Sequence, residues 1–552
     1  MSLLKVNNLC TDIKLSDQTI HAVKDISFEV NSGETFALVG ESGSGKSITA
    51  LSMARLLPDA AKITQGEILL HGENLLDYTE REMRAVRGSK ISMIFQEPMT
   101  SLNPVIRIED QIIECMIHHE KISKTVARAR CLDLLNAVGL PNARRNMSEY
   151  PHQLSGGMRQ RIMIAIALAA NPDVLIADEP TTALDVTIQA QVLELLKKLQ
   201  NELKMGLIFI THDLGVVQQI ADRVAVMRYG EIVEAASSEA FFSAPKHLYS
   251  QQLLNAVPSI HKRGMRLSVG GEKSVDSMKA LHEVNEHHHP VLDVSRLKVH
   301  FPIRKGIFKR TVGHVKAVND VSLQLYPGKT LALVGESGCG KTTVGKSIVR
   351  LLDVTGGDVM FQGQNLIKLY GEALRARRSE LQIVFQDPYS SLNPRMLVGD
   401  IIEEGMVSLG IEKNAGQRRL TVARLLKQVD LPEDAGNRYP HEFSGGQRQR
   451  ICIARALAVK PQVIICDEPT SALDVSVQAQ VLNLLKDLQA ELDMSYLFIT
   501  HDMSVVSYLA DDVAVMHQGV IVEKGSALDV LQNPQHDYTK KLLSAVPDLH
   551  LN

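Results

Sequence analysis

The amino-acid sequence predicts an α/β protein that contains two phosphate-binding-loop domains, one in each half of the chain. A G-x-x-x-x-G-K-[ST] pattern follows an apolar strand and precedes a helical segment, which is the setting that this loop requires. Further along, a buried apolar run ends in two adjacent carboxylates, as is typical of the carboxyl edge of a parallel sheet. Both features occur twice and in the same order. We therefore expect a duplicated domain that handles phosphate groups and holds a metal ion.

Length and composition are those of an ordinary soluble protein with several domains. At 552 residues the chain is too long for one core, because a domain typically holds about 150 residues. The net charge of −3 does not favour a nucleic-acid-binding surface. No apolar run approaches the ~18 residues of a membrane-spanning helix, and the first residues lack the apolar core of a signal peptide. Any role at a membrane is therefore expected to come through a partner.

The phosphate-binding loop of the first half lies at 40–47, after the strand-like stretch 23–39 and before a helical pattern. Its glycines allow backbone amides to approach phosphate oxygens. Lys46 is expected to reach the β- and γ-phosphates, and Ser47 to offer its hydroxyl to Mg²⁺. The residues expected to bind the nucleotide here are Gly40, Glu41, Ser42, Gly43, Ser44, Gly45, Lys46, Ser47 and Ile48.

Three further strand ends in the first half carry polar side chains. The buried run 174–177 delivers Asp178 and Glu179; one carboxylate can hold Mg²⁺, and its neighbour can take a proton from water. A short strand ends near Gln96, which could orient a water or touch the metal, with an exposed polar loop residue as the alternative. Another strand ends at His212, which could contact a γ-phosphate or the attacking water, or could be a packed histidine.

Helical segments surround these strand ends. A Ser-Gly-Gly turn at 155–157 opens an apolar helix, and amides at a helix N-terminus suit an anion. Before this turn, residues 107–140 are rich in helix formers with apolar spacing and predict a small helical insertion. After the carboxylate pair, residues 186–204 place apolar side chains at three- and four-residue steps, which predicts an amphipathic helix.

The same motifs return in order in the second half. The Ser-Gly-Gly turn, the carboxylate pair and the histidine are each displaced by 289 positions (444 − 155, 467 − 178 and 501 − 212). A constant displacement of this kind indicates a duplicated domain. The corresponding residues are Gly335, Glu336, Ser337, Gly338, Cys339, Gly340, Lys341, Thr342, Thr343, Gln386, Ser444, Gly445, Gly446, Gln447, Asp467, Glu468 and His501.

We expect a first domain at 1–260, a flexible linker at 261–290 and a second domain at 291–552. The linker stretch loses apolar periodicity and gathers Gly, Ser, Lys and His, which is typical of a solvated coil. A flexible coil of this length has a root-mean-square span of about 30 Å. That span is enough to join two domains packed head to tail.

With these motifs assembled, both halves resemble ATP-binding-cassette ATPases over nearly the whole chain. The resemblance implies two cassettes, each with a RecA-like α/β core, an antiparallel β subdomain and a helical signature subdomain. It implies Walker A loops at 40–47 and 335–342, with ATP and Mg²⁺ as the bound groups. The residues that would hold the metal are Ser47, Gln96 and Asp178 in the first half and Thr342, Gln386 and Asp467 in the second.

The resemblance also assigns roles around the reacting phosphate. Glu179 and Glu468 would be general bases, His212 and His501 the switch histidines, and Gln96 and Gln386 the Q-loop residues. Ser155, Gly156 and Gly157 match the signature motif, as do Ser444, Gly445 and Gly446 with the following Gln447. In this family the signature of one half completes the site of the other. ATP would then lie between Lys46 and Ser444, and between Lys341 and Ser155.

Further sequence features indicate which group within the family the chain resembles. The Q-E/D-P-x-x-S-L-N-P stretches and the tails at 247–258 and 536–547 are similar to those of the peptide/nickel/opine importer group. The fused layout and the segment 301–314 look most like the ATPase of Yej-type importers of oligopeptides and microcin-like peptides, with fused glutathione importer ATPases as near neighbours. The implied partners are two membrane permeases and, indirectly, an extracytoplasmic peptide-binding protein, with the ATPase bound peripherally at the cytoplasmic face of the inner membrane.

The chain departs from the family pattern at three places. Phe301 matches the aromatic residue that stacks on adenine in the second half, whereas Ile13 stands at the equivalent place in the first and lacks a π face. Met158 follows the first signature turn where the family usually has Gln. Some unfused relatives hold an iron–sulfur cluster near the cassette end, but no cysteine lies between 132 and 338 or after 466. We therefore expect no iron–sulfur cluster.

The sequence thus predicts an ATPase subunit that powers peptide import, in which both ATP sites hydrolyse. The alternatives are a soluble tandem cassette acting on ribosomes or DNA, an exporter ATPase, and an ATPase for glutathione or nickel import. The short Gly-containing linker, the slightly acidic charge and the absence of zinc-type cysteine pairs disfavour the ribosome and DNA alternatives. No nucleic-acid partner is expected, and the two cassettes are expected to pair within the chain.

Overall fold

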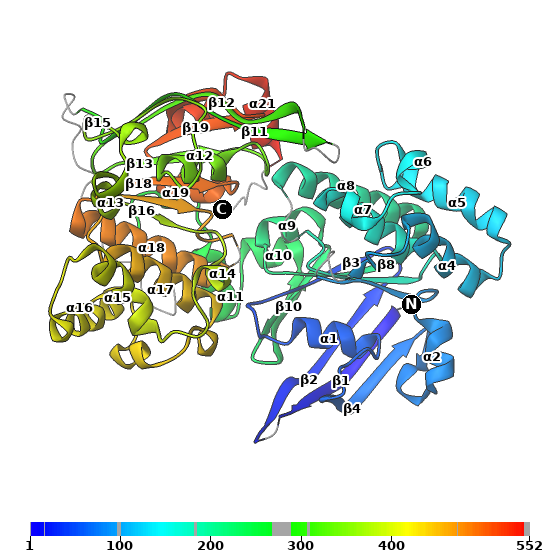
Figure 1. Ribbon diagram of the computed structural model, residues 1–552. Helices are drawn as coiled ribbons and strands as arrows, with labels where there is room; N and C mark the ends of the chain where they lie inside the picture. The colour runs from blue at the N-terminus through cyan, green and yellow to red at the C-terminus, as the bar shows by residue number, and fades with distance from the viewer. Residues whose placement is uncertain are drawn as a thin grey trace. The chain divides into compact units, whose positions relative to one another are not determined.

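The structure is a computed structural model that describes residues 2–15, 17–96, 101–181, 185–267, 289–305, 310–471 and 473–545. The chain divides into two compact units, Met1–Leu254 and Asn255–Val546, whose elements are labelled in Figure 1. Each unit contains a four-stranded antiparallel sheet and a six-stranded, mostly parallel sheet. This architecture confirms the α/β prediction and the duplication.

The first unit holds its mostly parallel sheet in the order β10-β9-β3-β8-β7-β6. Only β10 runs antiparallel to its neighbour. The antiparallel sheet has the order β2-β1-β4-β5. The strands are β1 (Ser2–Lys14), β2 (Thr19–Asn31), β3 (Thr35–Val39), β4 (Ala61–Leu70), β5 (Glu73–Asn74), β6 (Ile91–Ile94), β7 (Val174–Asp178), β8 (Gly206–Thr211), β9 (Arg223–Arg228) and β10 (Glu231–Ser237).

The central strands of this sheet are buried on both sides because different layers pack on its two faces. Along β7, Val174 and Ile176 join the core beneath the antiparallel sheet, while Leu175 and Ala177 join the core formed with the helical insertion. The helices are α1 (Lys46–Met53), α2 (Glu80–Val86), α4 (Ile108–Glu120), α5 (Lys124–Ala137), α6 (Ala143–Asn146), α7 (Gly156–Leu168), α8 (Val186–Leu203), α9 (Leu214–Ile220), α10 (Ser238–Ser243) and α11 (Leu248–Ala256). The predicted insertion corresponds to α4 and α5, and the predicted amphipathic helix to α8.

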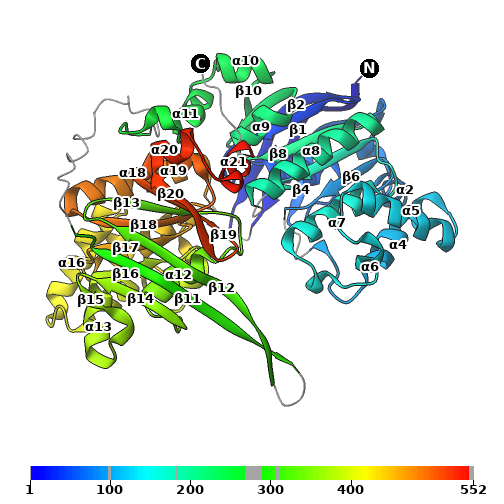
Figure 2. The ribbon, with the colours of Figure 1, turned by 90° about the horizontal axis from the view of Figure 1, so that it is seen from above.

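The second unit repeats this arrangement, with sheet orders β16-β17-β18-β13-β19-β20 and β12-β11-β14-β15. Its paired strands β11 and β12 run out well beyond β14 (Figure 2). The strands are β11 (Leu292–Lys305), β12 (Arg310–Leu325), β13 (Thr330–Val334), β14 (Gly356–Phe361), β15 (Gln364–Asn365), β16 (Leu381–Val384), β17 (Val463–Asp467), β18 (Ser495–Thr500), β19 (Asp512–His517) and β20 (Val520–Ser526).

The helices of the second unit follow the same order. They are α12 (Lys341–Ile348), α13 (Gly371–Glu380), α14 (Pro388–Ser391), α15 (Val398–Leu409), α16 (Ala415–Gln428), α17 (Gly445–Leu457), α18 (Val475–Leu492), α19 (Met503–Leu509), α20 (Ala527–Gln532) and α21 (Asp537–Ser544). Across the residues that the structure describes in both units, no helix is both long enough and apolar enough to span a membrane.

Residues 263–267, which we call the anchor segment, belong to the second unit. The sequence predicts that they are part of the flexible linker. The backbone N–H of Leu267 donates to Asn483 Oδ1 at 3.0 Å, and Asn483 Nδ2 donates back to Leu267 O at 2.9 Å. Tyr508 Oη donates to Met265 O at 2.9 Å, and Arg266 pairs with Asp487 at 3.0 Å. Leu267 is only 2% exposed. The beginning of the expected linker is therefore packed on α18 and α19, and residues 268–288 lie outside the described part.

The residues that bind the anchor segment are specific to the second unit. The 289-residue displacement relates Asn483, Tyr508 and Asp487 to Glu194, Gln219 and Lys198 in the first unit. None of these three residues repeats the side chain that holds the anchor segment. The docking surface therefore distinguishes two otherwise duplicated domains.

Substituting Asn483 by Ala should release the anchor segment. The change removes both partners of the buried Leu267 backbone, and each unpaired buried group costs about 1–3 kcal/mol. We expect trypsin to cleave the native protein faster after Lys262, Arg263 and Arg266, with the cut sites identified by mass. Glu194→Ala, the corresponding change in the first unit, is the control. Equal cleavage rates in the wild type and Asn483→Ala would show that the segment is not held by this residue.

Candidate active sites

The predicted polar residues of each unit meet at one edge of its parallel sheet. In the first unit, neighbouring strands β3, β8, β7 and β6 end at or near the phosphate-binding loop, His212, Asp178–Glu179 and Gln96. In the second unit, β13, β18, β17 and β16 lead in the same way to the second loop, His501, Asp467–Glu468 and Gln386. Parallel strands present their carboxyl ends on one side, so residues far apart in sequence come together there.

The loop glycines are required by close backbone approaches. Gly40 and Gly45 have positive φ angles of 156° and 104°. A Cβ atom at either position would lie 2.4 Å from a backbone oxygen, that of Met227 or Ala22 respectively. Gly335 and Gly340 repeat this situation, with φ angles of 149° and 112°. Side chains at these positions would push the loop off the sheet edge, which accounts for the glycine spacing.

The loop lysines are buried and fold back across their own loops. Lys46 Nζ donates to Gly40 O at 2.8 Å and to Glu41 O at 2.9 Å. In the second unit, Lys341 Nζ donates to Gly335 O at 2.7 Å and to Glu336 O at 3.0 Å. Both ammonium groups are thus positioned at the mouth of the loop, where phosphate oxygens are expected to bind.

A hydroxyl–carboxylate pair lies beside each lysine. Ser47 Oγ donates to Asp178 Oδ1 at 3.2 Å, and Thr342 Oγ1 donates to Asp467 Oδ1 at 2.9 Å. Burial raises the pKa of Asp178 to about 6, although the hydrogen bond from Ser47 opposes this shift. Burial likewise raises the pKa of Asp467. A nearby divalent cation would stabilise the ionised carboxylates, and adjacent hard oxygen ligands suit Mg²⁺. The residues present therefore fit this ion.

The second carboxylate of each pair bridges two other strand ends. Gln96 Nε2 donates to Glu179 Oε2 at 2.8 Å, while His212 Nδ1 lies 3.2 Å from Glu179 Oε1. The second unit repeats both distances closely. Gln386 Nε2 donates to Glu468 Oε2 at 2.8 Å, and His501 Nδ1 lies 3.3 Å from Glu468 Oε1. Gln96 and Gln386 are both exposed, as expected of polar loop residues, and each is bonded to the glutamate of its own unit.

Both glutamates have left-handed backbone conformations, with φ angles of 46° at Glu179 and 47° at Glu468. This conformation is uncommon for residues other than glycine and is tolerated where surrounding contacts fix it. The backbone N–H of each glutamate donates to the neighbouring strand, at Ile210 O and Ile499 O, over 2.9 Å. The turn redirects the glutamate side chain from the end of the strand toward glutamine and histidine.

Charge at the second glutamate is favoured by its neighbours. Burial raises the pKa of Glu468, but His501 and Lys341 outweigh burial and leave the pKa below its ordinary value. Burial lowers the pKa of His501, but Glu468 and Asp502 outweigh it and leave that pKa raised. Both shifts favour the charged forms of the pair, and an ionised Glu468 can accept a proton.

The signature residues lie on the helical subdomain, at the N-termini of α7 and α17, rather than on the sheet edge. Ser155 Oγ accepts Met158 N–H, and Ser444 Oγ accepts Gln447 N–H, both at 3.4 Å. Only Gln447 also returns a bond, its Oε1 accepting Ser444 N–H at 3.0 Å. Met158 has no side-chain group that can accept this bond well. The departure at Met158 therefore weakens the cap of the first signature helix and leaves Ser155 in place.

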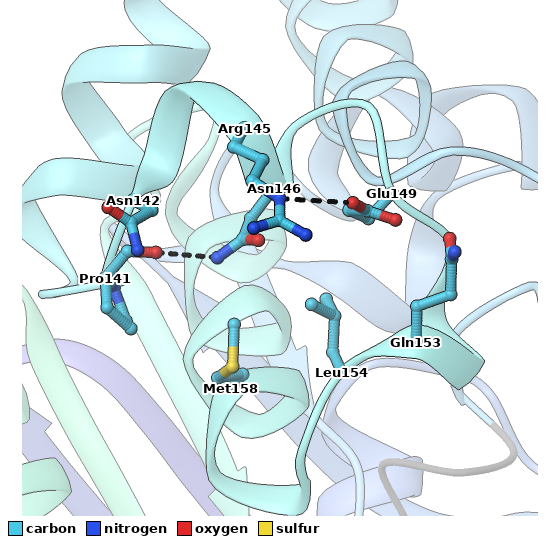
Figure 3. A pocket seen from close by; sticks show the side chains of 8 residues that line it. All are labelled: Pro141, Asn142, Arg145, Asn146, Glu149, Gln153, Leu154 and Met158. Carbon is cyan, nitrogen blue, oxygen red and sulfur yellow. Dashed lines mark hydrogen bonds and ion pairs between the residues drawn. The ribbon is translucent and has the colours of Figure 1, made fainter. Parts of the chain in front are cut away.

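Met158 also lines a surface pocket of about 420 Å³ beside the signature turn. Figure 3 shows Arg145 and Glu149 above it, joined by an ion pair with a 3.6 Å separation, and Asn146 bonded to the carbonyl of Pro141. The pocket belongs to the helical subdomain and contains none of the strand-end residues. It is not the nucleotide site.

The two candidate adenine-contacting residues occupy corresponding strands. Phe301 lies on β11, opposite Val315 of β12, and is 41% exposed. Ile13 lies on β1, opposite Ile20 of β2. An exposed aromatic face is thus available in the second unit, and an aliphatic side chain stands in the first. The difference that the sequence predicts between the two sites is retained in the structure.

The sequence reasoning missed one residue that contacts a phosphate-binding loop. Tyr538 of α21 accepts a hydrogen bond from the backbone N–H of Glu336 at 3.1 Å. The tail sequences around Tyr249 and Tyr538 were identified only as marks of resemblance. Their repetition in both halves was the available signal that the tails are part of the duplicated unit.

Two family models match regions in both halves of the chain. A family model described as ABC transporter matches residues 23–182 and 318–471. A model described as oligopeptide/dipeptide transporter, C-terminal region, matches residues 233–280 and 522–552. The solved ATP-binding cassette MJ0796, bound to ADP and Pi, has a TM-score of 0.40 and 30% identity, covering 43% of this chain and 98% of its own.

Curated relatives match along nearly the whole chain. The glutathione import ATP-binding protein GsiA of Pectobacterium atrosepticum is 49% identical, over 99% of this chain and 89% of its own. The GsiA proteins of Escherichia coli K12 and Salmonella paratyphi A are 49% and 50% identical, over 99% of this chain and 90% and 89% of their own lengths. These names correspond to the fused glutathione importer ATPases, which the sequence predicts as near neighbours, and not to the Yej-type ATPase that it predicts as most similar. The chain belongs to the ABC transporter family, in which it is an ATPase with two fused cassettes and the ATP-binding subunit of an importer of the peptide group.

Proposed function

We propose that this ATPase drives the uptake of small peptides, glutathione among them, through two membrane permeases that are separate chains. The observation that carries the proposal is the match to glutathione importer subunits over 99% of the chain, together with the oligopeptide/dipeptide transporter region at the end of both halves. Glutathione is itself a tripeptide, so the two indications concern one class of solute. The ATPase would bind peripherally at the cytoplasmic face of the inner membrane.

In the proposed mechanism, each loop wraps the phosphates of ATP with its backbone amides. Lys46 and Lys341, held at the mouth of the loop by its carbonyls, neutralise the charge that develops on the transferred phosphate. Mg²⁺ would be held by Ser47 and Asp178 in the first unit, with Gln96 nearby. In the second unit it would be held by Thr342 and Asp467, with Gln386 nearby. Bound there, the metal ion would neutralise phosphate charge.

The glutamates act on water in this mechanism. Glu179 and Glu468 accept a proton from the attacking water as it approaches the γ-phosphate. Gln96 and Gln386 hold one carboxylate oxygen of their glutamate, and His212 and His501 lie next to the other. These contacts fix the direction in which the base faces.

The signature turns would supply further contacts to phosphate. They comprise Ser155, Gly156 and Gly157 in the first unit and Ser444, Gly445 and Gly446 in the second. Amides at the starts of α7 and α17 offer the positive end of a helix dipole to phosphate.

Both sites are expected to hydrolyse ATP, because both keep every polar catalytic residue. Glu179→Gln and Glu468→Gln preserve side-chain size while removing the base, whose loss typically costs about 10²–10⁴ in rate at the affected site. We expect each single variant to retain roughly half of the turnover or less, with matching losses, and the double variant to have almost none. Steady-state phosphate release measures this. Wild-type turnover in one single variant and none in the other would contradict equal sites.

The import function predicts that two multi-span permeases accompany the tagged protein from gently solubilised membranes. The co-purified complex, reconstituted in vesicles with its binding protein, should show ATPase stimulation by glutathione or short peptides and none by Ni²⁺. The Glu179→Gln/Glu468→Gln complex is the matched control for contaminating ATPase. Recovery of ribosomal proteins or nucleic acid in place of permeases would overturn the import proposal and leave the ATPase chemistry intact.

A further inference from the structure

The C-terminal helix of the second cassette reaches its phosphate-binding loop. Tyr538, in the first turn of α21, accepts a hydrogen bond from Glu336 N–H over 3.1 Å. Glu336 is the second residue of the loop and directly follows Gly335. The matched C-terminal region, 522–552, therefore contacts the site where ATP is expected to bind.

This contact completes a clamp on one peptide group. The C=O of Gly335 and the N–H of Glu336 belong to the same planar peptide unit, and in the trans form they point in opposite directions. Lys341 Nζ binds the C=O at 2.7 Å, and Tyr538 Oη binds the N–H at 3.1 Å. Each bond polarises the peptide group in the sense that strengthens the other. The orientation of this peptide thus depends on Tyr538 as well as on the loop lysine.

Tyr538 is itself held firmly. Its ring lies against His517 at the end of β19, with 4.0 Å between ring centroids. The carboxylate of Glu523 on β20 accepts the backbone N–H groups of Gln535 at 2.7 Å and of His536 at 3.1 Å. His536 Nδ1 in turn accepts Tyr538 N–H at 3.1 Å. The start of α21 is therefore fixed to the sheet that carries the loop.

The same support exists in the first cassette, with a different neighbour for the ring. Glu234 accepts the backbone N–H groups of Lys246 at 2.8 Å and of His247 at 2.9 Å, and His247 Nδ1 accepts Tyr249 N–H at 3.2 Å. Arg228 takes the place of His517 and lies 4.4 Å from the centre of the Tyr249 ring. The start of the tail helix is therefore fixed to its sheet in the same way in both cassettes.

We propose that Tyr538 is a positioning residue of the second ATP site. It fixes the Gly335–Glu336 peptide, whose carbonyl holds Lys341 at the mouth of the loop before the nucleotide binds. The C-terminal region that characterises oligopeptide transporters is thereby part of the ATP site, and a displacement of α21 changes the position of the lysine. This role concerns ATP binding by an ABC ATPase and does not depend on which solute is imported.

Tyr538→Phe tests the proposal because it keeps the ring against His517 and removes only the hydroxyl. Loss of one hydrogen bond of about 1 kcal/mol corresponds to roughly a fivefold change. In the nucleotide-free protein, amide hydrogen exchange at Glu336 should accelerate by about this factor. In a Lys46→Ala background, which disables the first site, the dissociation constant of a fluorescent ATP analogue should rise by about the same factor.

Tyr370→Phe is the matched control, since Tyr370 is 73% exposed at the start of α13, away from the loop. It should leave exchange at Glu336 and nucleotide affinity unchanged. Unchanged exchange and unchanged affinity in Tyr538→Phe would overturn the proposal. Equal acceleration at amides throughout the second cassette would also overturn it, because that pattern reports a general loss of stability.

A double-mutant cycle tests whether Tyr538 acts through the amide. Glu336→Pro removes the N–H that donates to the tyrosine, since proline has no backbone N–H. If the proposal holds, adding Tyr538→Phe to Glu336→Pro produces no further loss of nucleotide affinity. A second loss as large as that of Tyr538→Phe alone would show that the tyrosine acts by another route, and the proposal would fail.

Discussion

Both sites depend on a constraint of the parallel sheet, namely that neighbouring buried strands end on the same side. In the first unit, β6, β7 and β8 bring Gln96 and His212 to within hydrogen-bonding reach of Glu179, although more than a hundred residues separate Gln96 from His212. The strands are held in register by their ladders and by apolar packing on both faces. Polar chemistry is therefore supported by an apolar core that tolerates little displacement.

The glutamate turn shows how this support is used. Glu179 and Glu468 have backbone conformations that cost about 1–3 kcal/mol for a residue with a side chain. The same left-handed conformation occurs in both halves of the chain. An extended conformation would continue the strand and aim the carboxylate elsewhere. The stability of the sheet thus offsets the cost of the backbone conformation that directs this side chain. This accounts for the separate roles of two adjacent carboxylates, one facing the loop hydroxyl and one facing glutamine and histidine.

Much of the fold and of the candidate sites could be predicted from the sequence. The features that could not be predicted depend on contacts between residues that are distant in the sequence. The glycine spacing of the loops and the apolar strands before Asp178 and Asp467 were visible, because they follow from local backbone geometry. The pairing of Gln96 with Glu179 required the strand order. The anchoring of residues 263–267 on Asn483 was missed, since polar and glycine-rich composition indicates a coil and says nothing about a receptor elsewhere. Tyr538 was missed for a similar reason, because the atom that it contacts is a backbone amide, which leaves no mark in the sequence.

The central claim is that each half of this ABC ATPase carries a complete set of nucleotide-binding residues. The most direct measurement is the number of ATP molecules retained per chain by the Glu179→Gln/Glu468→Gln variant, after rapid separation from free nucleotide in the presence of Mg²⁺. The account predicts two, because both loops keep their lysine, hydroxyl and metal-binding carboxylate. Retention of a single ATP per chain would contradict it and would show that one of the two sites does not hold nucleotide.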